Sequence, residues 1–346
     1  MDTAVFDKLI AELPGSVARI FFAGIGEPLA HPDIIRMVRQ AKGAGRRVEL
    51  ISNGMLLSRD VAAELVAAGL DTLWISLDST EVESFEAIRA GADFSTIMEN
   101  IRGFNRLRFY PYNYTPRYAR PKVELGVSFV LMKSNLEQFS KLLKMAGRLG
   151  ISRIKASHLI PYDVSQVSQA VYSDILDRDM YSRPGMVTAD VDIPHLDVAD
   201  MKNILPFMAD PGLSFSIMNT PLHIKQGQCR FITEDIAFVR QDGAVCPCMS
   251  LLHESTVYQG GNRRIVGRKI RPCSYGSITE QTLSQIWQGA DYAAFRERAA
   301  NASFSPCARC SPDMCNYIEG NEADCYNNPF PTCGACLWAQ GLVQCP

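Results

Sequence analysis

Eleven cysteines lie between residues 229 and 345, and the first 228 residues contain none. Two C-x2-C pairs stand among them: Cys307 with Cys310, and Cys333 with Cys336. Thiolates bind soft metals, and such pairs supply two neighbouring corners of a zinc site or an iron–sulfur cluster. Disulfides are the alternative, but an odd number of cysteines and a reducing compartment disfavour them. The spacing therefore indicates metal chemistry confined to the C-terminal region.

The composition is that of an ordinary globular protein with a sizeable core. The chain has 346 residues, 47% apolar and 21% charged, and its formal net charge of −2 gives no reason to expect nucleic acid as a partner. It contains no apolar run of about eighteen residues and opens without a signal-peptide pattern, so we expect a cytoplasmic protein without a membrane span. The arginine- and tyrosine-rich stretch 105–122 is interpreted as a solvent-exposed excursion of the chain between a helix and the next strand, or alternatively as a docking surface for a protein partner.

One pattern recurs in residues 18–160: an apolar strand, a short turn with glycine, asparagine or aspartate, and then an amphipathic helix. The predicted strands occupy residues 18–24, 47–54, 71–78, 122–132 and 152–160. Ser58 and Gly69 are expected to begin and end one helix, and Thr80 with Glu83 forms a capping-box pattern for the next. Near-continuous apolar strands alternating with helices predict a parallel sheet with both faces covered. Right-handed crossovers then curl this α/β sheet into an open or partial barrel.

Ligands of such sheets bind beyond the carboxyl ends of the strands. The residues expected there are small or polar: Gly24 to Pro28, Ser52 to Gly54, Ser76 to Asp78, Ser128, and Ser157 with His158. Glycines among them allow a close approach of the backbone to a ligand. Each set taken alone is also compatible with an ordinary strand-to-helix turn. The Gly24-x-Gly26 pair lacks the later glycine of a dinucleotide fingerprint, which disfavours a Rossmann fold.

Taken in order, these strand-end motifs resemble a radical S-adenosylmethionine (SAM) enzyme. "GIGEPLAHPD" resembles the family's Gly-Gly-Glu-Pro element, whose backbone holds the amino group of SAM, and "ISNG" and "ISLDS" resemble elements near the SAM ribose or carboxylate. Arg89 stands where the family often has an arginine that reaches the carboxylate. The resemblance implies a partial (β/α)6 barrel that lacks its first strand. It also implies a set of SAM-binding residues: Gly24, Gly26, Glu27, Ser52, Asn53, Asp78, Arg89 and Ser128.

The cysteine-rich end resembles a SPASM-type domain, which carries auxiliary iron–sulfur clusters. Cys229-x13-Gly243-x4-Cys248 fits its opening pattern, and Cys307-x2-Cys310-x4-Cys315 fits its middle with one residue fewer than usual. Residues 324–346 resemble the maturases associated with tungsten-containing aldehyde:ferredoxin oxidoreductases. The resemblance implies one or two auxiliary 4Fe–4S clusters and these metal ligands: Cys229, Cys248, Cys307, Cys310, Cys315, Cys325, Cys333, Cys336 and Cys345.

Other interpretations of the cysteine-rich end remain open from the residues alone. Structural zinc is the rival metal, because C-x2-C pairs serve four-cysteine zinc sites equally well. Cys246 and Cys273 are interpreted as core or surface thiols, and His253 as a packing residue rather than a ligand. Which cysteines share a cluster does not follow from their order along the chain.

These features divide the chain into three predicted parts. Residues 1–160 form a partial radical SAM core, residues 161–228 a bridging segment with helical pieces, and residues 229–346 the auxiliary iron–sulfur domain. The resemblance implies that a complete enzyme generates a deoxyadenosyl radical and acts on a peptide, protein or pterin-type substrate during maturation of a tungsten or molybdenum oxidoreductase. The implied partners are that oxidoreductase or a peptide client, and an electron donor such as ferredoxin or flavodoxin.

The sequence lacks one element of the family pattern. Radical SAM enzymes hold their SAM-cleaving cluster on a C-x3-C-x2-C loop upstream of the position of "GIGEP", and this sequence has no cysteine there. No catalytic residue is therefore predicted. The chain is expected to be either an N-terminally truncated enzyme or a cluster-less scaffold or electron-relay protein. The apolar stripe of the helix in residues 1–13 is expected to pack against the missing strand, beside an apolar edge strand at 18–24.

Overall fold

The computed structural model describes most of the chain. The described residues are 1–109, 121–172, 189–193, 213–217, 220–221, 229–260, 265–305, 307, 322–331 and 333–344. Most of the predicted excursion 105–122 and the predicted ligands Cys310, Cys315 and Cys345 lie outside them.

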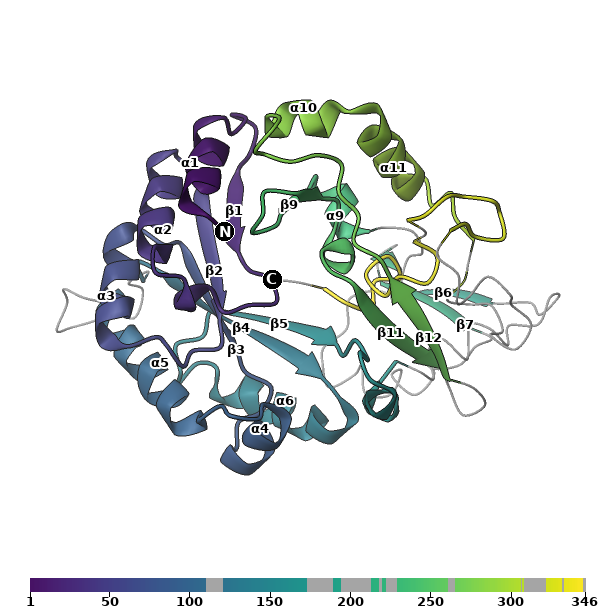
Figure 1. The fold of residues 1–346 in the computed structure, drawn as a ribbon. Coiled ribbons are helices and arrows are strands. Elements are labelled where there is room, and N and C mark those ends of the chain that lie inside the picture. The colour runs from purple at the N-terminus through teal and green to yellow at the C-terminus, as the bar shows by residue number, and fades with distance from the viewer. Residues whose placement is uncertain are drawn as a thin grey trace.

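The five predicted strands form one parallel sheet. They are β1 (Arg19–Phe22), β2 (Arg47–Ser52), β3 (Thr72–Ser76), β4 (Glu124–Leu131) and β5 (Arg153–His158). Each strand pairs with the next in chain order, so β1 and β5 are the edges. The α/β fold class is confirmed, and the helices line the outer face of the curved sheet (Figure 1).

The described residues of this half form six α-helices: α1 (Thr3–Ala11), α2 (Ile34–Gly43), α3 (Arg59–Ala68), α4 (Val82–Ile88), α5 (Phe94–Arg108) and α6 (Leu136–Met145). The Ser58 side chain caps α3, and Gly69 ends it with a left-handed φ of 84°. The capping-box prediction for Thr80 is wrong, because α4 begins only after Glu81, which makes no side-chain cap. The Thr80 hydroxyl instead donates a 2.7 Å hydrogen bond to Gln138.

The two faces of the sheet have different chemistry. Apolar side chains of alternating strand positions, such as Leu73 and Val127, are fully buried in the main core under the helices. Trp74, on the other face, donates from its indole nitrogen to Glu49 at 2.8 Å, and its ring lies so close to Gly126 that a Cβ there would come within 2.3 Å. Burial acts to raise the pKa of Glu49, but hydrogen bonds from Trp74 and Arg47 outweigh it, so that the pKa lies below its usual value.

The C-terminal region is built from short elements around two small antiparallel sheets. Its elements are α9 (Arg230–Thr233), β9 (Phe238–Val239), β10 (Val245–Cys246), η5 (Met249–Leu251), β11 (Ser255–Gly260), β12 (Ile265–Ile270), α10 (Leu283–Gln288) and α11 (Ala290–Ala300). β9 pairs with β10, and β11 with β12. This region lies across from the helices, on the open side of the main sheet (Figure 1).

The connecting segment 161–228 is described only in part, so the helical pieces that its sequence predicts stay a prediction. Its described residues include the 3-10 helix η3 (Val164–Gln169) and a three-stranded sheet of β6 (Ala189–Ile193), β7 (Leu213–Ile217) and β8 (Thr220–Pro221). Two further 3-10 helices, η1 (Pro28–Ala30) and η2 (Lys133–Asn135), follow strands of the main sheet. No helix of the described residues combines the length and the apolar character that a membrane span needs.

Helix α1 lies between the two halves of the molecule. Phe6 is 2% exposed and packs in the main core, with its ring centroid 5.8 Å from that of Phe22. Val5 and Leu9 pack against an apolar cluster of the C-terminal region, and Lys8 donates to the Thr279 carbonyl at 3.1 Å. The apolar stripe, for which the sequence predicts a further strand as cover, is thus buried here between the sheet and the C-terminal region.

The end of the chain also contacts the main sheet. The His158 amide of β5 donates to the Leu342 carbonyl at 3.3 Å, and the Gln344 amide donates to the Ser157 hydroxyl at 3.1 Å. The Gln344 side chain donates to the Ala156 carbonyl at 2.6 Å. These contacts hold the tail that follows Cys336 against the carboxyl end of β5.

Replacing Phe6 by alanine tests the role of α1. Because Phe6 is almost fully buried, Phe6→Ala should lower the free energy of unfolding by about 3–5 kcal/mol. Glu12→Ala, at an exposed position just after the same helix, is the control and should change it by less than about 0.5 kcal/mol. Denaturant unfolding monitored by circular dichroism measures both, and equal effects of the two substitutions would contradict the assigned packing.

Candidate functional site

The first candidate site lies at the carboxyl ends of β1 and β2. One oxygen of Glu27 accepts a 2.7 Å hydrogen bond from the Asn53 amide, and the other accepts one of 3.0 Å from the Leu29 amide. The Ser52 hydroxyl and the Asn53 side-chain oxygen each accept an amide hydrogen bond of 2.9 Å from their own turn. Glu27 therefore ties the two strand-end loops together.

The loop after β1 leaves its backbone open. Gly24 has a φ of 135°, and neither Gly24 nor Gly26 has a neighbouring atom within 4 Å of where a side chain would begin. Between them, Ile25 is 79% exposed. A loop with a left-handed glycine and free space around its backbone is suited to hydrogen bonding with a ligand.

The carboxyl ends of β3 and β4 are joined by Asp78. Its carboxylate accepts 2.8 and 2.7 Å contacts from the Arg89 guanidinium and a 2.7 Å hydrogen bond from the Val130 amide. Asp78 is buried, whereas the Arg89 side chain is 29% exposed. Ser128 is half-buried one strand position away from this pair, and its carbonyl accepts from the Leu77 amide. Arg89, predicted from the resemblance to reach a SAM carboxylate, is here held by a protein carboxylate.

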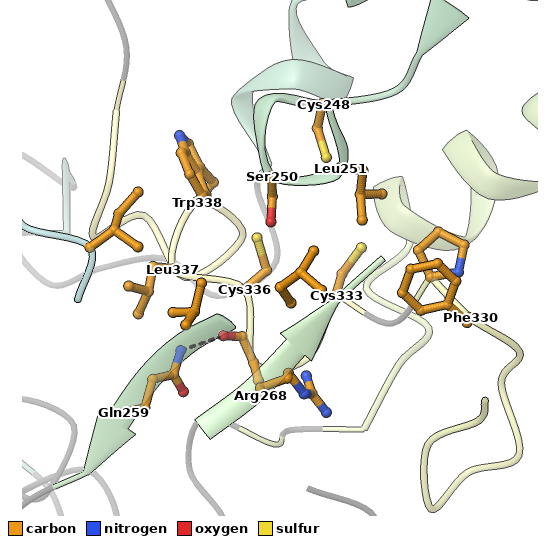
Figure 2. A pocket seen from close by; sticks show the side chains of 15 residues that line it. Cys248, Ser250, Leu251, Gln259, Arg268, Phe330, Cys333, Cys336, Leu337 and Trp338 are labelled. Atoms are coloured by element: carbon orange, nitrogen blue, oxygen red, sulfur yellow. Dashed lines mark hydrogen bonds between the residues drawn. The ribbon is translucent and has the colours of Figure 1, made fainter. Parts of the chain in front are cut away.

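The second candidate site brings together cysteines from distant parts of the chain. Four of the predicted ligands lie close enough for their thiols to raise one another's pKa, and we call them the four-thiol site: Cys229, Cys248, Cys333 and Cys336. Cys229 precedes α9, Cys248 precedes η5, and the C-x2-C pair lies in the tail. Figure 2 shows three of these side chains lining one pocket.

The pocket beside these thiols is small and mostly apolar. Its volume is about 50 Å³, and Leu251, Phe330 and Leu337 form much of its wall. A space of about 10–15 Å³ by this measure holds one water, so the cavity has room for a group of several heavy atoms. Apolar walls of this kind keep solvent from a metal centre and influence its redox chemistry.

Burial controls the protonation of the thiols. It raises the pKa of the Cys229 thiol to about 11 and places that of Cys248 well above its usual value, and neighbouring thiols raise both further. A thiol in such surroundings is inert unless a bound cation stabilises its thiolate form. Four neighbouring thiols, three of them at one cavity, therefore fit the donor set of an iron–sulfur cluster.

The arrangement is less suited to a single metal ion. Within the described part of the chain, no three His, Cys, Asp or Glu side chains lie in a geometry that would hold one ion. A four-cysteine zinc site places every sulfur about 2.3 Å from one centre. Three of the four thiols line one cavity, and they form no such single-ion group among the described residues.

The other described cysteines do not line this pocket, although the backbone of Cys307 lies beside Gly334 of the C-x2-C turn. Cys307 is half-buried, with its sulfur 3.1 Å from the Ser305 hydroxyl, and Cys325 is exposed. Burial raises the pKa of Cys246 to about 11, and the thiols of Cys246 and Cys273 influence each other, which agrees with their interpretation as packed thiols. His253 is exposed, so its interpretation as a packing residue is wrong.

The structure adds residues that the sequence did not single out. Gln259 on β11 and Arg268 on β12 line the same pocket as the thiols. The Gln259 side chain donates to the Ala335 carbonyl, inside the C-x2-C turn, at 2.7 Å. Single polar residues on a short hairpin form no recognisable sequence motif. The roles of Gln259 and Arg268 therefore become visible only from the pairing of β11 with β12 beside the tail.

Both regions match known families. The model of the radical SAM superfamily matches residues 1–115, and that of SPASM, an iron–sulfur cluster-binding domain, matches residues 229–311. The N-terminal region is therefore similar to the radical SAM superfamily, and the C-terminal region to the SPASM domain. SAM and iron–sulfur clusters, the cofactors that the sequence predicts, are those of these families.

Among individual proteins, the chain is 28% identical over its whole length to the tungsten-containing aldehyde ferredoxin oxidoreductase cofactor-modifying protein of Pyrococcus furiosus, covering 89% of that protein. It is 25% identical to the AdoMet-dependent heme synthase of Methanosarcina barkeri, over 77% of this chain and 67% of that one. The fold resembles that of Streptococcus suis SuiB bound to S-adenosylmethionine, with a TM-score of 0.52 and 14% identity over 95% of this chain and 67% of that one. It also resembles anSMEcpe with bound AdoMet and a peptide, with a TM-score of 0.51 and 15% identity over 92% and 79% of the two chains.

Glu27→Ala tests the link between the first two strand-end loops. A hydrogen bond to a charged group contributes about 1.5 kcal/mol or more, roughly tenfold in a local opening equilibrium. The Asn53 amide should therefore exchange its hydrogen at least about tenfold faster in the variant, as measured by hydrogen–deuterium exchange. Glu64→Ala, at an exposed position of α3, is the control and should leave that amide unchanged. Unaltered exchange in Glu27→Ala would show that Glu27 does not hold the loop.

Proposed function

We propose that this protein is a maturase-type radical SAM/SPASM protein whose four-thiol site binds one auxiliary 4Fe–4S cluster. The observation that carries the proposal is the convergence of four thiols from three separate segments, three of which line one cavity. We assign the remaining predicted ligands to a second cluster: Cys307, Cys310, Cys315, Cys325 and Cys345. We propose the same three parts as the sequence predicts: residues 1–160 as the radical SAM core, residues 161–228 as a bridging segment, and residues 229–346 as the domain that holds the auxiliary clusters.

The residues of the four-thiol site and its cavity would supply thiolate ligands and would exclude water from the cluster. Their thiols give up protons when metal binds, which turns the unfavourable burial of thiolate into favourable coordination. Leu251, Leu337 and Phe330 exclude water from the cavity. When bound, a cluster here supplies single-electron chemistry or a site for substrate.

We propose the strand-end loops of the main sheet as the SAM site. Exposed backbone at Gly24 and Gly26 would bind the amino group, while Asn53 and Ser52 border the position of the ribose or carboxylate. Asp78 orients Arg89 through two short contacts. Ser128 of the neighbouring strand β4 pairs with Ser76, the last residue of β3, and in the proposal borders the same site.

The proposed client is a tungsten or molybdenum oxidoreductase in the cytoplasm, acted on through a peptide, protein or pterin-type substrate. The printed name of the Pyrococcus furiosus relative supports this client, and so does the resemblance of residues 324–346 to maturases. The electron donor in the proposal is a small redox protein such as ferredoxin or flavodoxin.

A second function is favoured by one observation on the sequence. The 346 residues contain no cysteine before Cys229, so this chain supplies no thiolate for a SAM-cleaving cluster on the main sheet. The alternative to a maturase is therefore a scaffold or electron-relay protein that uses its auxiliary clusters and a partner enzyme.

Replacing Cys248 tests the four-thiol site. After anaerobic reconstitution, Cys248→Ser should contain about four iron and four sulfide fewer per chain than the unsubstituted protein. Cys246→Ser is a matched control, because Cys246 is equally buried two residues away but lies outside the site. Equal iron loss in both variants, or stoichiometric zinc without acid-labile sulfide in anaerobically isolated protein, would contradict the assignment.

The 346-residue protein should produce no 5′-deoxyadenosine from SAM under a strong reductant. The reason is that reductive cleavage needs an iron–sulfur cluster beside SAM, and the sheet region offers no thiolate ligand. Chromatography of the anaerobic reaction measures the product. Turnover well above a reductant-only background would show that an auxiliary cluster cleaves SAM, and the proposed division of roles would then fail.

A further inference from the structure

Arg268 is the one arginine among the described residues that line the thiol cavity. It lies in the middle of β12, paired with Val257 of β11. Its guanidinium Nη2 is 4.0 Å from the Cys307 sulfur, and the same side chain borders the cavity together with Cys333 and Cys336. Arg268 therefore lies near Cys307 and also borders the cavity that Cys333 and Cys336 line, and Figure 2 shows its side chain among those at the cavity.

The surroundings make this charge effective. Most of the described residues of the cavity wall are apolar. Burial raises the pKa of the Cys333 and Cys336 thiols, while the Arg298 and Arg268 charges act to lower that of Cys333 and the Arg268 charge acts to lower that of Cys336. Electrostatic interactions in such a poorly hydrated space are stronger than at an exposed surface.

The hairpin fixes the guanidinium relative to the thiols. Gln259, two residues after the position that pairs with Arg268, binds the Ala335 carbonyl between Cys333 and Cys336. This hydrogen bond joins β11 to the C-x2-C turn. The distance between Arg268 and the turn is thus set by strand pairing rather than by a flexible loop.

We propose that Arg268 raises the reduction potential of the cluster held by the four-thiol site, an inference that rests on the proposed function. A 4Fe–4S cluster with four thiolates is an anion, and reduction adds one electron from a low-potential donor without making or breaking a bond. A fixed cation beside the cluster stabilises the more negative, reduced form. Arg268 thereby makes the cluster easier to reduce.

The test is a redox titration of the anaerobically reconstituted full chain, followed by electron paramagnetic resonance. Arg268→Gln should lower the equilibrium constant for reduction of the cluster at least tenfold. For a one-electron couple this shifts the reduction potential by about 59 mV to a more negative value. Lys269→Gln removes the same charge from the next residue of the strand, which is exposed, and should leave the potential unchanged. Arg268→Lys keeps the charge and should restore most of the shift.

The outcomes separate this inference from the proposed function. A potential that is unchanged in Arg268→Gln, with full iron content, overturns the role of Arg268 but leaves the cluster assignment intact. Iron that persists in Cys248→Ser refutes the cluster assignment itself. If Arg268→Gln fails to retain its cluster, the reduction potential of Arg268→Lys is the test instead, because this variant keeps the positive charge. A potential far below that of the unsubstituted protein would then contradict the electrostatic role of Arg268.

Discussion

The cost of burying thiolates governs the C-terminal region. Its four-thiol site collects side chains from two turns and the tail, separated by more than a hundred residues from Cys229 to Cys336. The cavity between them is apolar, so these side chains are unfavourable there as anions unless metal is bound. The elements of this region are short, with strands of only two to six residues. Metal binding and folding should therefore be coupled in this region, because its small cores leave little other stabilisation.

Two contacts connect the C-terminal region to the main sheet. The tail leaves the C-x2-C turn and binds the carboxyl end of β5 through Leu342 and Gln344. Helix α1 presents Phe6 to the sheet and Val5 to the C-terminal region. Each contact uses backbone hydrogen bonds or a buried apolar face rather than exposed ion pairs. The strand-end loops and the four-thiol site are therefore held in one arrangement, as electron transfer between two sites would need.

Periodicity was sufficient to predict the sheet, because both faces of each strand are constrained by burial. All five strands and the ends of α3 agree with their predictions. The capping pattern at Thr80 failed because Gln138, distant in sequence, takes the hydroxyl. Cysteine spacing indicated candidate ligands, which stay a prediction, but not their grouping, since Cys229 and Cys336 meet only through tertiary packing. Arg268 left no sequence signal, because its importance depends on which residue lies across a cavity.

The two candidate sites use charge in opposite ways. At the strand ends, Arg89 is neutralised by Asp78, and the same carboxylate also accepts the Val130 amide. The pair orders the loops but presents little net charge, so binding of SAM there would depend on backbone groups and shape. At the thiol cavity Arg268 approaches the Cys307 sulfur, and the described wall residues include no acidic side chain. In the proposed function, SAM is therefore recognised at the sheet chiefly by geometry, whereas electrostatics contribute at the cluster, because a SAM molecule carries its own cation and a thiolate-bound cluster would be an anion.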